Sequence, residues 1–296
     1  MSNYIPPRRP KADKEYRVNK PASLLNFLTE TLQDRSRTTI KSYLSHRQIT
    51  VNGKTETQFD LALRPGDTIT LRAVGERTQN PNHKVRIVYE DDHIIVVDKK
   101  PGVLSMSTGK EGEQTAYSVM TEHVRHYNRN NRIFIVHRLD RDTSGLLLFA
   151  KNEEIQEILQ SNWNENVITR SYVAVVEGCP TPDHGEIVSW LTENPKSLKM
   201  ESSPTDNGGK KAITRYKTIK SNGLYTLLEV NLATGRKNQI RVQLASIGHP
   251  IAGDKRYGAK NNPLGRLCLH ARTLRFIHPA TGQVMNFDTD IPAIFR

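Results

Sequence analysis

The first quarter of the chain combines two helical patterns with two strand patterns. In the first helical pattern, the apolar residues recur at helical spacing and are Leu24, Leu25, Phe27, Leu28 and Leu32. A second helix is predicted over residues 36–48, "SRTTIKSYLSHRQ", whose basic residues lie away from its apolar face. The strand patterns "ITVNG" and "LRPGDTITL" follow, marked by an Asn-Gly and a Pro-Gly turn. We therefore expect a small helix, helix, strand, strand domain over residues 18–74.

Strand patterns dominate the remainder of the chain. They include "VRIVYEDDHIIVVDKK", "RIFIVH", "LLLFAK", "RSYVAVVEG", "KAITRYKTI", "LYTLLEVNL" and "RLCLHARTLRFIH". Helical patterns are fewer, chiefly "TAYSVMTEHVRHYN", "EEIQEILQSNW" and "RKNQIRVQLASIG". This distribution predicts the α+β class, with a mixed, mainly antiparallel sheet in one larger domain over residues 85–296. Residues 75–84 are expected to form a polar linker, and residues 1–17 a flexible basic arm.

The net charge of the chain indicates which class of partner it binds. The 296 residues carry a formal net charge of +12, more than half of it in residues 1–84. This excess favours nucleic acid as a partner, because cations that neutralise phosphates release counterions; a basic surface that only serves solubility is the alternative. No apolar run approaches the roughly 18 residues of a membrane span. The first residues lack the apolar core of a secretory signal, so we expect a cytoplasmic protein without a membrane partner.

Common cofactor and metal motifs are absent from the sequence. It has no GxxxxGK[ST] phosphate loop, no GxGxxG after a strand, no HExxH and no GxSxG. Cys179 and Cys268 lie far apart and show no metal-ligand spacing. We therefore expect neither a cofactor nor a metal.

Two charged segments remain as candidates for chemistry. "HRLDRDTSG" places Asp140 between two apolar strand patterns, with Thr143 to Gly145 as turn residues. A carboxylate held there would need a cation, although a turn aspartate that caps local N–H groups is the simpler interpretation. "TGRKNQIR" places Arg236, Lys237 and Arg241 around a glycine turn that opens a helix, an arrangement suited to phosphate or carboxylate.

The predicted N-terminal domain resembles the small RNA-binding domain named after ribosomal protein S-four. The resemblance rests on "SRTTIKSYLSHRQITVNGKT" and "LRPGDTITL". It implies that the basic second helix and the adjoining turn face RNA, through Arg35, Arg37, Lys41 and Arg47. A solvated helix face is the alternative for each of these residues.

The larger domain resembles the RluA-type pseudouridine synthases over nearly its whole length. The resemblance rests on "YEDDHIIVVDKKPGVLSM", "HRLDRDTSGLLLFAK", "RSYVAVVEG", "TGRKNQIRVQLASIGHPIAGDKRYG" and "LCLHARTLRFIHP", which occur in the order of that family. With the S-four-like domain in front, the resemblance points to the subgroup that acts on large-subunit (23S) ribosomal RNA.

The resemblance implies a role for particular residues. Asp140 matches the catalytic aspartate, and Arg241 the arginine that pairs with it. Tyr172 matches the aromatic residue that stacks on the target uracil and assists proton handling. Arg138 matches the arginine that replaces the flipped nucleotide, and Ile240 and Leu269 fit the apolar pocket around the base. Isomerising uridine involves no redox change and no external group, which agrees with the expected lack of a cofactor.

Two positions depart from the family pattern. Asn238 and Gln243 stand where the family usually has histidines, and we interpret both as a subfamily change. The segment "KKPG" is interpreted as structural.

The sequence thus predicts a cofactor-free, aspartate-dependent RNA pseudouridine synthase that acts as a monomer. A transfer-RNA synthase of the same family and a non-catalytic RNA-binding or ribosome-assembly factor are the alternatives. The presence of Asp140, Tyr172 and Arg241 together favours the enzyme.

Overall fold

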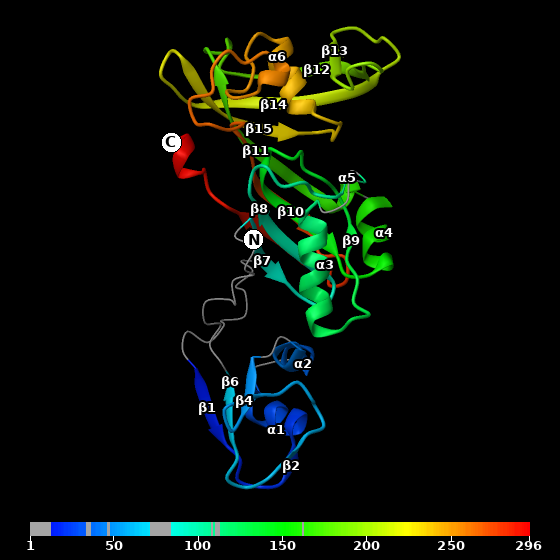
Figure 1. The fold of residues 1–296 in the computed structure, drawn as a ribbon, viewed down its shortest axis with the longest axis vertical. Helices are drawn as coiled ribbons and strands as arrows, with labels where there is room; N and C mark the ends of the chain where they lie inside the picture. The colour runs from blue at the N-terminus through cyan, green and yellow to red at the C-terminus, as the bar shows by residue number, and fades with distance from the viewer. Residues whose placement is uncertain are drawn as a thin grey trace. The chain divides into compact units, whose positions relative to one another are not determined.

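The computed structural model describes residues 13–33, 37–45, 48–71, 84–107, 109, 113–161 and 163–296. The chain divides into two compact units, Met1–Pro81 and Asn82–Arg296 (Figure 1). Residues 1–12 of the predicted arm and residues 75–83 of the predicted linker lie outside the described residues.

Unit 1 is a small α/β fold built around its own apolar core. Its elements are β1 (Lys14–Arg17), β2 (Ala22–Ser23), α1 (Leu24–Thr31), α2 (Arg37–Ser45), β3 (Ile49–Val51), β4 (Lys54–Thr55), β5 (Ala62–Leu63) and β6 (Thr68–Leu71). One sheet has the strand order β1-β6-β3-β4, and β2 pairs with β5. Leu24 and Leu28 of α1, Ile40 of α2, Ile49 of β3 and Ile69 of β6 are fully buried.

Strand β1 differs from the sequence-based expectation. Residues 14–17 were expected to belong to a flexible arm, but they pair antiparallel with β6, from Lys14 opposite Leu71 to Arg17 opposite Thr68. The pairing satisfies backbone groups along an edge of β6 that would otherwise be open.

Unit 2 begins with a strand pair and alternates strands with few helices. Its first half contains β7 (Val85–Glu90), β8 (Ile94–Lys99), α3 (Ala116–Tyr127), β9 (Phe134–Ile135), β10 (Ser144–Ala150), α4 (Glu153–Ser161), α5 (Trp163–Asn166) and β11 (Val167–Glu177). Its second half contains β12 (His184–Glu193), β13 (Met200–Ser203), β14 (Lys210–Ser221), β15 (Tyr225–Leu232), α6 (Gln239–Ser246), η1 (Lys255–Tyr257), β16 (Leu269–Ile277), β17 (Val284–Asp288) and η2 (Ala293–Phe295).

The strands of unit 2 form one large sheet. Its order is β13-β12-β14-β15-β11-β16-β10-β8-β7, with β17 paired to β16 and β9 to β10. Among the pairings of the described strands, β10 with β16 is parallel and the others are antiparallel. The predicted α+β class with a mixed, mainly antiparallel sheet is therefore confirmed.

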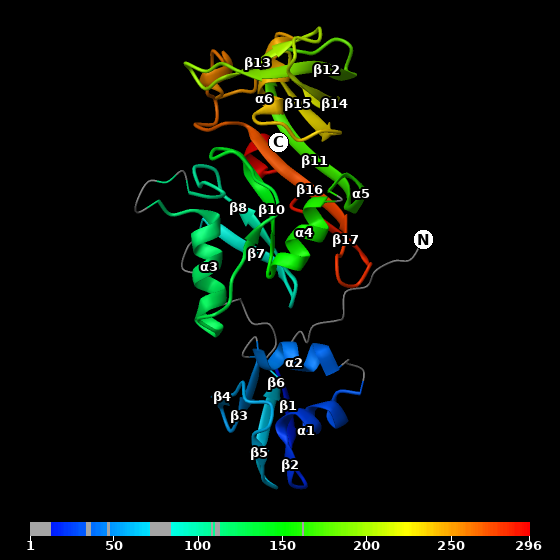
Figure 2. The ribbon, with the colours of Figure 1, turned by 90° about the vertical axis from the view of Figure 1, so that its right-hand side faces the viewer.

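Helices cover both faces of the β7-β8-β10 part of the sheet. Residues of α3 pack with Ile95 and Val97 of β8, whereas Ile155 and Leu159 of α4 pack with Ile94 and Val96. Because successive strand residues point to opposite faces, the two helices lie on opposite sides. Helix α6 packs at the other end of the sheet, against β12, β13 and β14 (Figures 1 and 2).

The start of β10 also differs from expectation. Ser144 and Gly145 were expected to be turn residues, but they are the first residues of β10, where Gly145 lies opposite Ala271 of β16. A side-chain carbon at position 145 would lie 2.1 Å from the Ala271 carbonyl oxygen, so the parallel pair requires a glycine.

Along the described helices, none combines the length and the apolar character needed to cross a membrane.

Candidate active site

Asp140 lies in the loop that joins β9 to β10. Leu139 is buried, 4% exposed, and fixes the loop to the core, while the Asp140 side chain is 26% exposed. The Thr143 N–H donates to the Asp140 carbonyl oxygen at 3.2 Å and closes a turn. The Asp140 carboxylate is thus partly accessible to solvent, on a loop held in place by the buried Leu139 and by this turn.

The segment after β8 holds this loop in place. Lys99 is fully buried, and its Nζ donates to the carbonyl oxygens of Val103 at 2.8 Å and Arg141 at 3.0 Å. The Ser105 hydroxyl donates to the Leu139 carbonyl at 2.8 Å and accepts from the Leu139 N–H at 3.0 Å. Burial lowers the pKa of Lys99 to about 8, opposed by the charges of Asp142 and Asp140. These contacts support the structural interpretation of the "KKPG" segment.

Arg241, on α6, bridges two carboxylates. Its Nη1 donates to Asp140 Oδ2 at 3.1 Å, and its Nε and Nη2 donate to Asp254 at 2.7 and 2.8 Å. The Asp254 side chain is 1% exposed and that of Arg241 12%. Burial opposes the charge of Arg241, but its hydrogen bonds and attraction to Asp254, followed by those to Asp140, raise the pKa of the guanidinium. Arg241 therefore stays a cation beside Asp140.

Asn238 holds Asp140 from a second direction. Its amide lies between the carboxylate and the Tyr257 hydroxyl, and because a carboxylate only accepts, the amide nitrogen faces Asp140. It donates to Oδ2 at 2.8 Å and Oδ1 at 3.0 Å, while the amide oxygen accepts from the Tyr257 hydroxyl at 3.0 Å. The Tyr257 oxygen also accepts from the Met200 N–H at 3.1 Å, and its ring lies 5.0 Å below the Arg241 guanidinium.

An apolar wall stands beside this carboxylate. Tyr172 of β11, Ile240 of α6 and Leu269 of β16 are 8%, 4% and 3% exposed and belong to one core cluster. Burial raises the pKa of the Tyr172 phenol, Asp140 raises it further, and Arg170 acts in the opposite direction. Tyr172 is therefore a neutral hydrogen-bond donor at physiological pH.

The predicted RNA-contacting residues of unit 2 lie at the surface. Arg138 is exposed, two residues before Asp140. Arg236 Nε donates to the Lys211 carbonyl at 3.2 Å, and Lys237 pairs with Glu193. The ion pair of Lys237 with Glu193 and the hydrogen bond from the Arg236 side chain to the Lys211 carbonyl hold both side chains against the protein surface.

The predicted RNA contacts of unit 1 are partly described. Arg37 and Lys41 are exposed on α2, whose opposite face buries Ile40 and Leu44. Arg35 and Arg47 lie outside the described residues.

The comparison with known proteins decides the family. A family model described as RNA pseudouridylate synthase matches residues 93–246, which include Asp140, Tyr172 and Arg241. The chain belongs to this family. The expected class of enzyme, an RNA pseudouridine synthase related to the RluA type, is thereby confirmed.

Curated relatives cover most of this synthase. An uncharacterized RNA pseudouridine synthase, YlyB of Bacillus subtilis, is 32% identical over 90% of this chain and 89% of its own. Ribosomal large subunit pseudouridine synthase D of Vibrio cholerae is 33% identical over 90% of this chain and 86% of its own.

Solved structures share the fold of the synthase. Human RNA Pseudouridylate Synthase Domain Containing 4 has a TM-score of 0.57 and 23% identity, covering 71% of this chain and 89% of that chain. Human RNA Pseudouridylate Synthase Domain Containing 1 has a TM-score of 0.56 and 23% identity, covering 69% of this chain and 82% of that chain.

The two departures from the family pattern have different surroundings in this synthase. Asn238 faces Asp140, whereas Gln243 is fully buried and points to the sheet. Gln243 accepts from the Thr214 hydroxyl at 2.6 Å and donates to the Ser189 hydroxyl at 2.9 Å and the Ala212 carbonyl at 3.0 Å. Gln243 therefore fastens α6 to β12 and β14, and these bonds lead away from Asp140.

Sequence reasoning assigned no role to three residues that support the site, Lys99, Asp254 and Tyr257. Lys99 carries a signal, because it ends, directly after Asp98, a strand whose first four residues are apolar. Asp254 and Tyr257 stand in the motif "AGDKRYG" but are ordinary loop residues by type, so only the fold shows that they meet Arg241 and Asn238.

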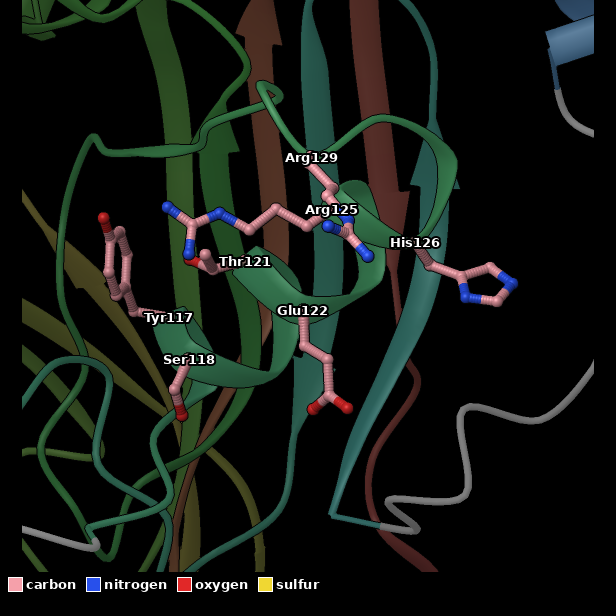
Figure 3. Close-up of a pocket in the computed structure, with 7 residues that line it drawn as sticks. All are labelled: Tyr117, Ser118, Thr121, Glu122, Arg125, His126 and Arg129. Atoms are coloured by element: carbon pink, nitrogen blue, oxygen red, sulfur yellow. The ribbon is translucent and has the colours of Figure 1, made fainter.

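An open hollow also follows the outer side of α3. It is lined by Tyr117, Ser118, Thr121, Glu122, Arg125, His126 and Arg129. Figure 3 shows that Tyr117 and His126 point to opposite sides of the helix. None of the predicted catalytic residues lines this hollow. Among the residues that the structure describes, no group of three His, Cys, Asp or Glu side chains is placed to hold a metal.

Proposed function

We propose that the synthase converts uridines of large-subunit ribosomal RNA to pseudouridine, with Asp140 as the reacting carboxylate. The observation that carries the proposal is the double support of Asp140 by the Arg241 guanidinium and the Asn238 amide. The choice of RNA follows relatives named ribosomal large subunit pseudouridine synthase D, which are 33% and 30% identical over 90% of the chain. The reaction then takes place in the cytoplasm.

The residues around Asp140 suit each requirement of this isomerisation. The bond from uracil N1 to the sugar C1′ breaks, a bond from C5 to C1′ forms, the proton of C5 leaves and N1 gains one, so no oxidant is needed. The carboxylate attacks the sugar or the ring, or removes a sugar proton, and each route requires its ionised form. The Arg241 guanidinium pairs with the carboxylate at 3.1 Å and fixes its direction.

The target base must also leave its stack. Flipping a base costs a few kcal/mol, which contacts in the pocket and in the vacated stack must offset. We assign the Tyr172 ring as the platform for the uracil, with Ile240 and Leu269 as its apolar surroundings. The exposed Arg138 is assigned to fill the vacated stack, because its side chain stands free of the core two residues from Asp140.

The first prediction is that Asp140→Asn abolishes pseudouridine formation and keeps RNA affinity within about twofold. The substitution preserves size and removes the charge that every route uses. Pseudouridines are mapped in ribosomal and transfer RNA of cells that lack the gene and carry the wild type or the variant.

The matched control is Asp142→Asn, since Asp142 is half-exposed and pairs with the exposed Arg141. This control restores the missing sites, whereas Asp140→Asn leaves them absent. Full activity of Asp140→Asn would refute the assignment of the carboxylate. Loss of transfer-RNA sites instead of ribosomal sites would refute the substrate, and loss of no site would favour a binding factor.

A further inference from the structure

Arg170 of β11 is a partly buried cation with open donors. Within the described part of the chain, its guanidinium takes part in no hydrogen bond and no ion pair. A guanidinium carries five N–H donors, and a partly buried one is usually paired. Arg170 lies two residues before Tyr172 on the same strand, and the two side chains are close enough for each to affect the pKa of the other.

Other partly buried arginines of this unit are satisfied. Arg241 bonds to Asp140 and Asp254, and Arg266 donates to the Ser144 hydroxyl at 2.7 Å and the Leu269 carbonyl at 3.2 Å. Burial lowers the pKa of Arg170, and the tyrosine beside it opposes this only in part. The open donors of Arg170 are therefore a local exception.

The surroundings of Arg170 fix its guanidinium in space. Its Cζ lies 5.4 Å from the centre of the Trp163 ring, which itself packs 5.0 Å from the His137 ring. On another side, a side-chain carbon at Gly235 would come within 2.8 Å of Nη1 of Arg170. The guanidinium thus stacks on an indole and touches the loop that leads into α6, while the edges of its plane stay available.

The structure assigns Arg170 as a binding site for a backbone phosphate of the RNA, next to the uridine that enters the pocket beside Tyr172. A planar guanidinium held by stacking binds phosphate through two parallel N–H bonds. Arg236 and Lys237, on the adjoining loop, each bond to a protein group, whereas no donor of Arg170 is used in the described part of the chain. This inference rests on the proposed function, because RNA supplies the phosphate.

The test measures binding of a uridine 20-mer, (U)20, over a series of salt concentrations. For single-stranded RNA, each phosphate contact contributes about 0.7 to the slope of log affinity against log salt. We expect Arg170→Gln to weaken binding about tenfold at low salt and to lower the slope by about that amount. Arg170→Lys keeps most of the slope but binds more weakly, since it loses the bidentate geometry.

A matched control and a second variant separate phosphate binding from a packing role. Arg215→Gln removes the same charge from β14, where Arg215 pairs with Glu186, and leaves the slope unchanged. Gly235→Ala keeps every charge but displaces the Arg170 guanidinium, so we expect it to lower the affinity for (U)20. When Arg170→Gln is added to Gly235→Ala, the affinity should fall no further, because both changes remove the same contact.

An unchanged slope in folded Arg170→Gln, as seen by its circular dichroism, would overturn the inference and leave Arg170 as a stacking partner of Trp163. If Arg170→Gln does not fold, an unchanged affinity of Gly235→Ala overturns it equally. This inference is tested by the binding of (U)20, and the proposed function is tested by the mapped pseudouridines. Failure of one can therefore be distinguished from failure of the other.

Discussion

At the scale of single residues, the site depends on how each oxygen of Asp140 is held. Oδ2 accepts from Arg241 and Asn238, and Oδ1 accepts from Asn238. Asn238 has a left-handed backbone, with φ 53°, a conformation that asparagine tolerates better than most residues. This conformation precedes α6 and brings the Asn238 amide to the same carboxylate as Arg241, three residues later.

We predict that Asn238→Ala lowers kcat by about 10- to 100-fold and changes KM little. Hydrogen bonds to a charged group contribute about 1.5–3 kcal/mol, and about 1.4 kcal/mol corresponds to a factor of ten. Steady-state kinetics on the mapped ribosomal RNA fragment give both constants.

Tyr257→Phe serves as the companion variant, because it removes only the hydroxyl that orients the Asn238 amide. Its loss in kcat is smaller, and the double variant is no worse than Asn238→Ala alone. A wild-type kcat for Asn238→Ala would show that Arg241 suffices to position Asp140.

The meeting of Asp140 and Arg241, 101 residues apart, is a contact that the family resemblance implies. The bond from Asn238 to Asp140 could not be predicted, since it depends on a backbone conformation and on Tyr257. The open N–H donors of Arg170 could not be predicted either, because a sequence does not show which cations lack a partner.

At the scale of elements, the parallel contact between β10 and β16 sets the end of the loop that carries Asp140. Ser144 lies opposite His270, and its hydroxyl bonds to His270 Nδ1 at 2.8 Å. His270 Nε2 bonds to the Thr289 hydroxyl at 2.7 Å. Three segments that are distant in sequence are thus tied together at this point.

We predict that Gly145→Ala destabilises the protein by about 3 kcal/mol or more. The new methyl group would meet the Ala271 carbonyl at 2.1 Å, in a residue with φ +112°. Chemical denaturation followed by circular dichroism measures the free energy of unfolding.

Gly282→Ala is the control, since Gly282 also has a positive φ, +69°, but meets nothing within 4 Å. It costs about 1 kcal/mol from backbone strain alone. Equal decreases in the free energy of unfolding of the two variants would show that the close approach of β16 to position 145 does not contribute to the destabilisation.

A pH dependence follows from His270. Burial lowers its pKa to about 4, so as the pH falls from 6.5 the unfolded chain takes up a proton that the folded protein does not. This contribution to stability is lost between pH 6.5 and about 4, and amounts to about 3 kcal/mol. The free energy of unfolding is compared for the wild type and His270→Gln at pH 7 and pH 4.5.

His184→Gln is the control, because the His184 side chain is 74% exposed. The gap between the wild type and His270→Gln narrows on acidification, and by more than any change in the gap for His184→Gln. A constant gap for His270→Gln would contradict the depressed pKa.

Most central strands could be predicted because they are continuous apolar runs, as in residues 94–97 of β8. Strand β12 was not predicted, although Ile187 and Leu191 alternate correctly. Between them the buried residue is Ser189, whose polarity interrupts the pattern. It is tolerated there because Gln243 bonds to its hydroxyl, a contact that appears only after folding.

At the scale of the whole molecule, the chain has two units with separate apolar cores, and we assign a different role to each. The core of unit 1 includes Leu24, Leu28 and Ile40, and none of its buried residues belongs to the described clusters of unit 2. Every residue that we assign to the reaction lies in unit 2. We therefore expect unit 1 to contribute to RNA binding alone, so that mutation can separate binding from the reaction.

We predict that the double variant Arg37→Glu with Lys41→Glu raises KM for ribosomal RNA about tenfold and leaves kcat unchanged. Both residues are exposed on α2, and reversing their charges removes favourable interactions with phosphates. Steady-state kinetics on the same fragment provide the measurement.

The control combines Lys20→Glu with Lys54→Glu, which makes the same change in net charge away from α2. Its KM rises less than twofold. Equal effects of the two double variants would mean that net charge, and not the α2 surface, accounts for the affinity.

The pairing of Arg241 with two carboxylates has a consequence for the course of the reaction. Any route in which Asp140 bonds to the sugar or the ring consumes its negative charge. Arg241 would then be a buried cation without a counter-ion, were it not for Asp254, which is 1% exposed and bonds to it twice. On such a route the two bonds to Asp254 would remain, so the Arg241 guanidinium would keep a counter-ion while Asp140 carried a neutral ester.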